Sequence, residues 1–232
     1  MLLFVGLGNP GAKHAGNRHN VGFMAVNRIA ADHGFGPWKA KFQGLVSDGI
    51  LSGTKIVLLK PQTFMNVSGQ SVGDAMRFYR LTPADVTVFY DELDLAPGKV
   101  RVKTGGGSAG HNGIRSMDAH IGPDFRRIRL GIGHPGHKDR VSGYVLSDFP
   151  KADADWLADL LTGLSDGVLH LAAGDEARFL NAVALRTAPP RSSTTPKPPP
   201  PAPPPSTPPA VTPETPDETP VGLLRRLADR FR

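Results

Sequence analysis

Proline is distributed so unevenly along the chain that the sequence must comprise two unlike parts. Of the 23 prolines in 232 residues, fifteen lie between Pro189 and Pro220, and only eight lie in the first 188 residues. A low-complexity segment of Pro, Ser and Thr cannot bury enough surface to offset the entropy that is lost on ordering. We therefore predict a folded body over residues 1–186 and a disordered, Pro-rich linker over residues 187–220.

The last twelve residues, 221–232, have a pattern of their own. Leucines and a phenylalanine recur at helical spacing and four arginines lie at other positions, which predicts a short basic amphipathic helix. Such a helix could dock on a partner or on an anionic surface, although twelve residues are marginal for an isolated helix. The alternative is a frayed terminus without a role, and the sequence identifies no partner for this segment.

Composition excludes several classes of protein. The chain has no cysteine, which rules out a disulfide scaffold, a cysteine nucleophile and a cysteine metal site. It has no run of 18 apolar residues to span a membrane and no N-terminal signal-peptide pattern, so we expect a cytoplasmic protein. The formal net charge of +6 favours a polyanionic partner such as nucleic acid, but modestly basic proteins of other kinds are also common.

Within the body, short apolar runs alternate with segments of helical periodicity. Strands separated by helices predict an α/β fold, and hairpin-length links between some strands predict that the sheet is mixed. We therefore expect a single domain in which a mixed, twisted sheet is flanked by helices. The expected strands cover residues 2–5, 44–50, 55–60, 86–90, 99–103 and 127–133, and the expected helices cover residues 20–33, 68–79, 112–121 and 151–173.

The first expected strand runs into a glycine motif, G-L-G-N-P-G at residues 6–11, which matches the dinucleotide-binding pattern. In that pattern a helix starts at the last glycine, so that its amides meet a pyrophosphate. Here Pro10 lacks an amide donor and the helical pattern starts only near Asn20, which argues against a dinucleotide site. We interpret the motif as a tight turn that presents the Asn9 amide at the carboxyl end of a strand.

Three further motifs suggest chemistry that their surroundings do not favour. Ser108 lies in a G-x-S-x-G sequence, but the strand before it is short and charged and four glycines surround the serine, so a serine nucleophile is disfavoured. The strand 86–92 resembles a Walker B strand in a chain that has no P-loop. His134 and His137 could bind a metal, although a turn is the simpler interpretation of H-P-G-H.

His19 is the best candidate for an acid–base group. It lies between Arg18 and Asn20, just before an expected helix and near the turn that holds Asn9. An imidazole with a reference pKa of about 6.5 suits a general base at neutral pH, provided that an acceptor orients its other nitrogen. Asp91, at the end of a buried strand, is the natural orienting residue, although an aspartate at a strand end often only caps a turn.

Two other sets of residues point to what the site could bind. Asparagines, which donate and accept without charge, recur at strand and helix ends and suit an amide-rich ligand such as a peptide backbone. Basic residues alternate along two neighbouring strands and would form a phosphate-binding patch if they share a face; the alternative is a solvated strand face. The two sets are Asn9, Asn20, Asn66 and Asn112, and Lys99, Arg101, Lys103, Arg126, Arg127 and Arg129.

Six stretches, in order, together resemble the bacterial peptidyl-tRNA hydrolase family over about residues 1–185. The combination is highly specific, although each stretch alone is not. The stretches are V-G-L-G-N-P-G at 5–11, R-H-N-V-G at 18–22, K-P-Q-T-F-M-N-V-S-G at 60–69, D-E-L-D-L at 91–95, the segment 105–113 ending in H-N-G, and R-L-G-I-G-H-P-G at 129–136.

The resemblance implies an esterase without metal or cofactor that cleaves the bond between a peptide and tRNA. By motif match, His19 would be the general base, Asp91 would orient it, and Asn9 would help to distinguish an N-blocked acyl group from a free amine. The family usually has tyrosine where this chain has His14, so His14 is a candidate contact to the tRNA end and a rival base. The resemblance further implies that a flexible loop, 105–110, gates the cleft, that Phe64, Asn66 and Asn112 hold the peptide and tRNA 3′ end, and that Lys103 and Arg129 bind phosphate.

The residues also leave two other functions open. The first is a serine hydrolase that uses Ser108, and the second is a non-catalytic RNA-binding module. We favour the esterase because His19 and Asp91 occur together with the asparagine set and the basic strands. An ester with a sugar hydroxyl as leaving group is easier to hydrolyse than an amide, so one positioned base and a few amide donors could suffice without a covalent nucleophile.

Overall fold

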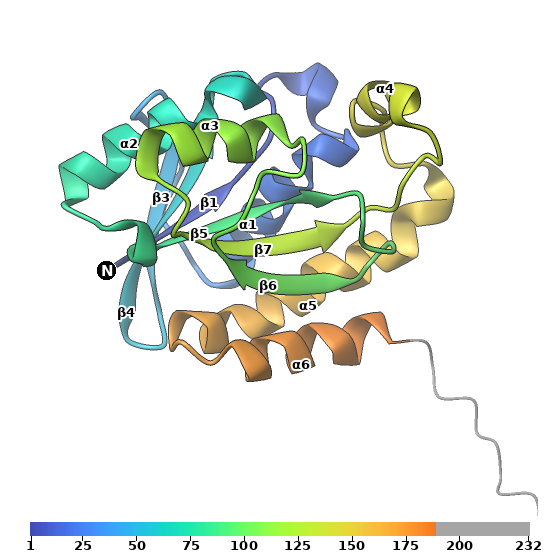
Figure 1. Ribbon diagram of the computed structural model, residues 1–232. Helices are drawn as coiled ribbons and strands as arrows, with labels where there is room; N and C mark the ends of the chain where they lie inside the picture. The colour runs from blue at the N-terminus through green and yellow to red at the C-terminus, as the bar shows by residue number, and fades with distance from the viewer. Residues whose placement is uncertain (189–232) are drawn as a thin grey trace, which may run out of the picture. The chain divides into compact units, whose positions relative to one another are not determined.

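The computed structural model describes residues 1–188, so the predicted terminal helix and nearly all of the predicted linker lie outside the described residues. Seven strands form one sheet in the order β2-β3-β4-β1-β5-β7-β6 (Figure 1). β1 pairs in parallel with β4 and β5, and β5 with β7, whereas the other neighbours are antiparallel. The strands are β1 (Leu2–Gly6), β2 (Lys39–Lys41), β3 (Gly44–Leu51), β4 (Thr54–Pro61), β5 (Val86–Glu92), β6 (Val100–Thr104) and β7 (Arg126–Gly131).

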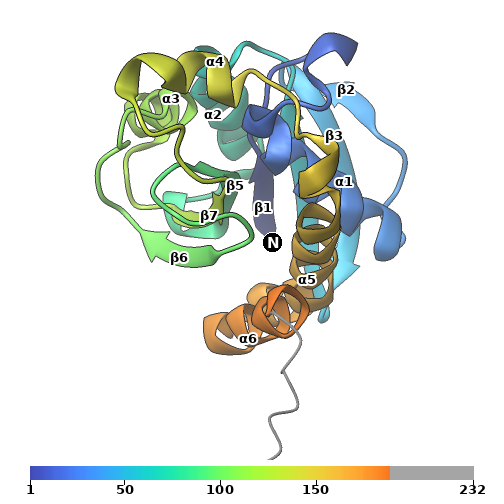
Figure 2. The same ribbon diagram turned by 90° about the vertical axis from the view of Figure 1, so that its right-hand side faces the viewer.

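Helices cover both faces of this sheet, so the predicted α/β class with a mixed, flanked sheet is confirmed. One face packs through Phe4, Leu58 and Phe89 against α1 (Val21–Asp32), α5 (Ala154–Ala172) and α6 (Glu176–Thr187). The other face packs through side chains such as Val5 against α2 (Ser68–Tyr79) and α3 (Asn112–Ile121). Figures 1 and 2 show these two layers, with the short helix α4 (Val141–Val145) above one end of the sheet.

Two glycines allow α1 to lie directly on the middle of the sheet. A Cβ atom on Gly22 of α1 would lie 2.3 Å from the Phe89 carbonyl oxygen, and one on Gly6 of β1 would lie 2.3 Å from the Gly22 carbonyl oxygen. No side chain fits at either position, so the helix backbone touches the strands. This close approach holds the start of α1 against the carboxyl ends of β1 and β5, where ligands bind in open α/β sheets.

The structure contains elements that the sequence pattern did not predict. α6 follows α5 after a short turn and pairs with it as a helical hairpin, and β2 and α4 are too short to show periodicity. Asn20 precedes α1 as expected, but its side chain does not cap the helix; it bonds to the turn after β1. The expected long helix begins at Ala154, because residues 151–153 form a separate 3-10 turn.

None of the helices in residues 1–188 is both long enough and apolar enough to cross a membrane.

Candidate active site

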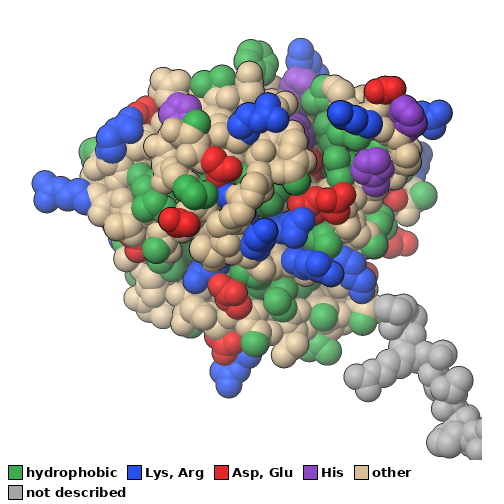
Figure 3. Space-filling model, viewed as in Figure 1, with side chains coloured by type: hydrophobic (Ala, Val, Ile, Leu, Met, Phe, Trp, Pro, Cys, Tyr) green, Lys and Arg blue, Asp and Glu red, His purple; other side chains and the backbone are tan. Residues whose placement is uncertain are grey.

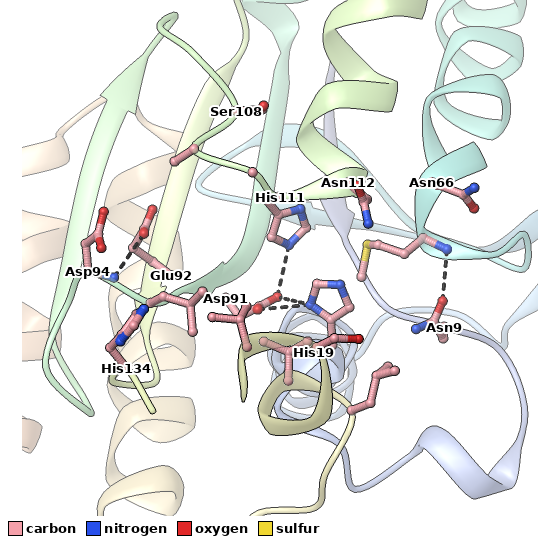
Figure 4. A pocket seen from close by; sticks show the side chains of 18 of the residues that line it. Asn9, His19, Asn66, Asp91, Glu92, Asp94, Ser108, His111, Asn112 and His134 are labelled. Carbon is pink, nitrogen blue, oxygen red and sulfur yellow. Dashed lines mark hydrogen bonds and ion pairs between the residues drawn. The ribbon is translucent and has the colours of Figure 1, made fainter. Parts of the chain in front are cut away.

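A cavity of about 740 Å³ opens at the carboxyl ends of β1 and β5. The segments after β1, β4, β5 and β6 form its polar part, and α4 contributes an apolar wall through Val141, Val145 and Leu146. Most of the predicted site residues lie around it: Asn9, His19, Phe64, Asn66, Asp91 and Asn112. Figure 4 shows five of these side chains, those of Asn9, His19, Asn66, Asp91 and Asn112, on different segments of the chain around the cavity.

Asp91 is the centre of the polar cluster and is only 3% exposed. Nδ1 of His19 lies 2.8 and 2.9 Å from the two carboxylate oxygens of Asp91, and Nε2 of His111 lies 3.0 Å from one of them (Figure 4). A carboxylate only accepts hydrogen bonds, so both ring nitrogens donate. The remaining nitrogen of His19, Nε2, is therefore the basic nitrogen of the neutral ring.

The surroundings fix the orientation of each histidine. His19 belongs to a 3-10 turn, Arg18–Asn20, that leads directly into α1, and the two histidine rings pack with centroids 4.8 Å apart. His111 precedes α3, and its Nδ1 accepts the amide of Ile114 at 3.2 Å. Because Nδ1 of His111 accepts, its proton lies on Nε2, which is the nitrogen that faces Asp91.

His19, Asp91 and His111 also have the composition of a metal site, since their ligand-type atoms lie within 4.8 Å of one another. Each histidine, however, points a protonated nitrogen at the carboxylate, and His111 has its only lone pair engaged by Ile114. Metal-bound histidines instead point an unprotonated nitrogen at the ion. The geometry therefore fits a hydrogen-bonded acid–base cluster better than a cation site.

The cluster perturbs the pKa values of its members. Burial would raise the pKa of Asp91, but the two histidines and their hydrogen bonds hold that pKa well below its usual range. Burial alone would lower the pKa of His19, yet the charge and hydrogen bond of Asp91 outweigh it, and the net direction is upward. Asp91 is thus a permanent anion that stabilises the protonated form of His19.

Asn9 presents its amide donors to the cavity because its other groups are already engaged. Its backbone amide donates to Asn20 Oδ1 at 2.9 Å, and Asn20 Nδ2 donates to the Asn9 carbonyl at 2.9 Å. The Met65 amide donates to Asn9 Oδ1 at 2.9 Å, which directs the side-chain NH₂ group away from Met65. Asn9 can therefore donate to a carbonyl oxygen in the cavity.

The other predicted contact residues differ in position. Phe64 is 67% exposed at the edge of the cavity, and Asn66 and Asn112 are exposed at the starts of helical segments. Asn112 extends toward His19 (Figure 4). His14 lies outside the cavity lining, and its Nδ1 pairs with Asn17 Oδ1 at 2.9 Å. The geometry thus favours His19 over His14 as the base.

The wall formed by α4 is fastened to the turn that carries His19. Arg18 donates to Ser147 Oγ at 2.6 Å and to the Asp148 carbonyl at 2.9 Å, and its guanidinium lies 4.3 Å from the centre of the Tyr144 ring. Asn17 donates to Asp148 at 2.8 Å. Arg18 is buried, so the contacts of the residue next to His19 hold the apolar wall over the cavity.

The basic residues of β6 and β7 do not all form a surface patch. Lys99, Arg101 and Lys103 are exposed on the face that carries α3, whereas Arg126 points to the opposite face and pairs with Glu176 of α6. Arg129 is partly exposed and pairs with Glu92 at 2.8 Å. Figure 3 shows blue side chains beside red ones in this region. The predicted phosphate pair, Lys103 and Arg129, therefore has one exposed cation and one that an acid already partners.

Arg127, between these positions, is 1% exposed and has a structural environment. It pairs with Asp118 of α3 at 2.7 Å, donates to the Gly107 carbonyl at 3.1 Å and stacks on Phe125. The glycine-rich loop of residues 105–110 is thus tied to the sheet at one point. Of the six basic residues, Arg126 therefore lies on the other face of the sheet, and Arg127 lies on the same face as Lys103 but is buried.

The alternative catalytic groups gain no support from the geometry. Within residues 1–188, no hydrogen bond joins the Ser108 hydroxyl to a histidine, and two of the three histidines that line the cavity with Ser108, His19 and His111, are bonded to Asp91. His134 and His137 each accept a backbone amide within their own turn, from Gly136 and Asp139. These two contacts agree with the interpretation of H-P-G-H as a turn.

Sequence reasoning assigned no role to His111, although it contacts Asp91 directly. Two sequence features could have pointed to His111: it lies at the N-terminal end of an expected helix and within one of the stretches that resemble the family. Its second bond, to a strand end twenty residues earlier, depends on how α3 packs on the sheet. The apolar wall of α4 had no sequence signal, because five residues show no helical period.

Comparisons with known proteins agree with the resemblance. Residues 3–190 match the family model described as Peptidyl-tRNA hydrolase. A peptidyl-tRNA hydrolase from Cereibacter sphaeroides is 69% identical over all of both chains, and one from Dinoroseobacter shibae is 66% identical over all of both chains. The crystal structure of peptidyl-tRNA hydrolase from Acinetobacter baumannii has a TM-score of 0.75 and 42% identity, and the match covers 79% of this chain and 94% of that one. The chain therefore belongs to the peptidyl-tRNA hydrolase family and is an ester hydrolase that acts on peptidyl-tRNA.

Proposed function

We propose that His19 is the general base that activates water for attack on the ester carbonyl of peptidyl-tRNA. The observation that carries this proposal is the pair of contacts from His19 Nδ1 to the Asp91 carboxylate at 2.8 and 2.9 Å. They place the proton on Nδ1 and leave Nε2 as the acceptor on the cavity side. Asp91 orients the ring and stabilises the imidazolium that forms when His19 takes a proton from water.

Asn9 is the candidate contact for the acyl group. Its NH₂ group, oriented by the Met65 amide, can donate to a peptide carbonyl oxygen, which an N-blocked aminoacyl group has and a free aminoacyl group lacks. A free α-amino group is largely protonated at neutral pH and can only donate hydrogen bonds, so it could not accept one from the NH₂ group of Asn9. This contact favours peptidyl-tRNA over aminoacyl-tRNA as the substrate.

The remaining polar groups are candidate contacts for the tRNA end. Phe64 offers an exposed ring for stacking on a terminal base, and Asn66 and Asn112 offer amides at the cavity edge. Lys103 and Arg129 lie on β6 and β7, beyond the cavity, where a phosphate of the acceptor stem would be reached. Because charged tRNA is used in translation, we place this activity in the cytoplasm.

The test is ester hydrolysis with purified N-acetyl-aminoacyl-tRNA. His19→Ala is expected to lower kcat by roughly 10²–10⁴-fold, while tRNA binding stays within about twofold, because the base acts only in the chemical step. His14→Ala and Ser108→Ala are the matched variants, and each is expected to retain most of kcat. Full activity of the His19→Ala enzyme would refute the proposal.

The two other functions predict different outcomes in the same assay. A serine hydrolase loses activity in Ser108→Ala and forms a burst of acyl-enzyme, whereas a water-attack mechanism shows neither. An RNA-binding module binds the tRNA and releases no peptide at all. Comparison of N-acetylated with free aminoacyl-tRNA then tests whether Asn9→Ala reduces the discrimination between the two.

A further inference from the structure

A second hollow, of about 190 Å³, lies on the other side of Asn9 from His19 and Asp91. Asn9 lines both cavities, but the second one extends over the start of α1 and the ends of β3 and β4. Phe23, Met24 and Leu45 form apolar walls, and the turn after β1 contributes Pro10, Gly11 and Ala15. The other lining residues are polar: Asn9, Asn20, Asn27, Lys60 and Gln62. Apart from the contacts of Asn9 and Asn20, none of the contacts described above involves a residue that lines this hollow.

Among residues 1–188, Lys60 supplies the only charged side chain that lines this hollow. Its Nζ donates to Asn27 Oδ1 at 2.6 Å and lies 3.9 Å from the centre of the Trp38 ring. Within residues 1–188, no carboxylate lies within ion-pair distance of Lys60 Nζ. Burial lowers the pKa of Lys60, which is the expected effect on a cation that has lost water and gained no anion.

The neutral polar groups of the hollow are also arranged as donors. Lysine can only donate, so the oxygen of Asn27 must face Lys60 and its NH₂ group is left for another partner. Gln62 Nε2 makes only long contacts, of 3.4 and 3.5 Å, to backbone carbonyls next to it. The hollow thus has the charged donor Lys60 and the two neutral donors Asn27 and Gln62 above apolar walls. This arrangement fits a ligand with an aliphatic stem and an anionic head.

The order of strands indicates which half of the substrate reaches this hollow. β4, which carries Lys60, lies on one side of β1 and β5, whereas β7 and β6, which carry Arg129 and Lys103, lie on the other side. A substrate whose ester lies at His19 and whose RNA extends over β7 and β6 directs its acyl half past Asn9 toward β4. This step rests on the proposed function.

We propose that the hollow around Lys60 is a peptide subsite that accepts an acidic side chain of the residue preceding the esterified one. The carboxylate pairs with Lys60 Nζ, and the donors of Asn27 and Gln62 complete its coordination. The aliphatic stem of the side chain packs on Phe23, Met24 and Leu45. The subsite gives the enzyme a preference among peptides, whereas Asn9 selects only for the presence of a peptide.

The experiment compares three N-acetyl-dipeptidyl-tRNAs that share the tRNA and the esterified residue and differ in the preceding residue: glutamate, glutamine or lysine. We expect kcat/KM of the wild-type enzyme to be about five- to tenfold higher for glutamate than for glutamine, since the pair is only partly buried, and lowest for lysine. Lys60→Met is expected to bring the glutamate-to-glutamine ratio close to one. Lys55→Met, which removes the same charge from an exposed position on β4, is expected to preserve the ratio.

Each other outcome overturns the subsite. If the wild-type enzyme has nearly equal kcat/KM for the glutamate and glutamine substrates, the subsite is refuted without any variant. Failure of Lys60→Met to fold would therefore not block the test. An equal loss of kcat/KM for all three substrates in Lys60→Met, with a smaller salt dependence, would show that Lys60 binds a tRNA phosphate instead. Equal effects of Lys55→Met and Lys60→Met would indicate long-range charge only. Wild-type turnover of N-acetyl-aminoacyl-tRNA, which has no preceding residue, tests the proposed function separately.

Discussion

The cluster around Asp91 and the basic strands β6 and β7 are both polar regions on the same sheet, and they are built in opposite ways. At Asp91 two histidines from different segments meet one carboxylate, and the sheet, α1 and α3 hold all three residues. On β6 and β7, residues of one chemical type diverge. Arg127 is buried against Asp118, Arg129 is shared with Glu92, and Lys103 is exposed.

The difference shows that chemical function follows from convergence on one partner, whereas a charge pattern along a strand does not specify a binding face. A buried carboxylate that accepts from two donors is costly to leave unpaired, so the packing around it must hold both donors in place. An arginine on a strand, in contrast, can contact solvent, a phosphate or an acidic side chain of the helix packed on that face, so its partner depends on the neighbouring element. Substitution of any member of the Asp91 cluster should therefore impair the proposed chemistry, most strongly at the shared carboxylate, whereas each residue of the basic strands should have its own separate effect.

The largest expected effect is that of Asp91→Asn. The amide can turn its NH₂ group toward His19, which favours the tautomer with the proton on Nε2 and removes the base, so we expect kcat to fall roughly 10²–10⁴-fold. A single-turnover measurement with saturating enzyme isolates the chemical step. Retention of more than a third of kcat would show that Asp91 is not required to orient His19.

The pH profile of the residual activity tests the electrostatic role of Asp91. In the proposed mechanism neutral His19 is the base, so kcat/KM should rise with pH through the pKa of His19, which Asp91 raises above 6.5 in the wild-type enzyme. In Asp91→Asn the raising charge is lost and burial, which lowers the pKa, remains, so the rise should shift to lower pH. A shift to higher pH would contradict this assignment; rates without enzyme must be subtracted because the ester hydrolyses in alkali.

His111→Ala is expected to have the next largest effect. It removes one of the two donors to Asp91 and the side-chain acceptor for the Ile114 amide, but His19 keeps its own bond to Asp91. We expect kcat to fall about ten- to a hundredfold with a smaller change in KM. His111→Asn, which can still donate to Asp91, is the matched variant and should recover part of the loss. If the two variants were equally impaired, the hydrogen bond to Asp91 would not be the cause.

Much of the fold could be predicted from local patterns, because its central elements are long and periodic. The mixed sheet, α2 and the strand whose carboxyl end carries Asp91 follow from apolar spacing and hairpin-length links. The position of His19 beside Asp91 followed from where each stands relative to a strand or helix end. The role of His111 did not, because it depends on the packing of α3, and the burial of Arg127 depends on a partner in α3 that no strand pattern reveals.

Arg127→Met tests whether the buried arginine holds the glycine-rich loop. The substitution leaves Asp118 without its partner and removes the bond to the Gly107 carbonyl, so we expect the free energy of unfolding to fall by about 2–3 kcal/mol. Amide exchange in residues 105–110 should accelerate. In the double variant Arg127→Met/Asp118→Asn the unpaired carboxylate is removed, so the free energy of unfolding should recover. Amide exchange in the loop should stay fast, because the bond to the Gly107 carbonyl is still missing.

The smallest expected effects are on tRNA binding, and they distinguish the exposed Lys103 from Arg129, which pairs with Glu92. Lys103 has no acidic partner among residues 1–188, so Lys103→Met should weaken tRNA binding a few-fold and reduce the salt dependence of binding by about one charge. Arg129→Met also leaves Glu92 as an unpaired acid beside the RNA, so its loss of affinity should exceed that of Lys103→Met. Arg126→Met is the control. Arg126 lies on β7 like Arg129, but it points to the opposite face and pairs with Glu176, so its loss should leave the salt dependence of tRNA binding unchanged. Equal slopes for all three variants would mean that net charge, and not the face of the sheet, determines where the tRNA lies.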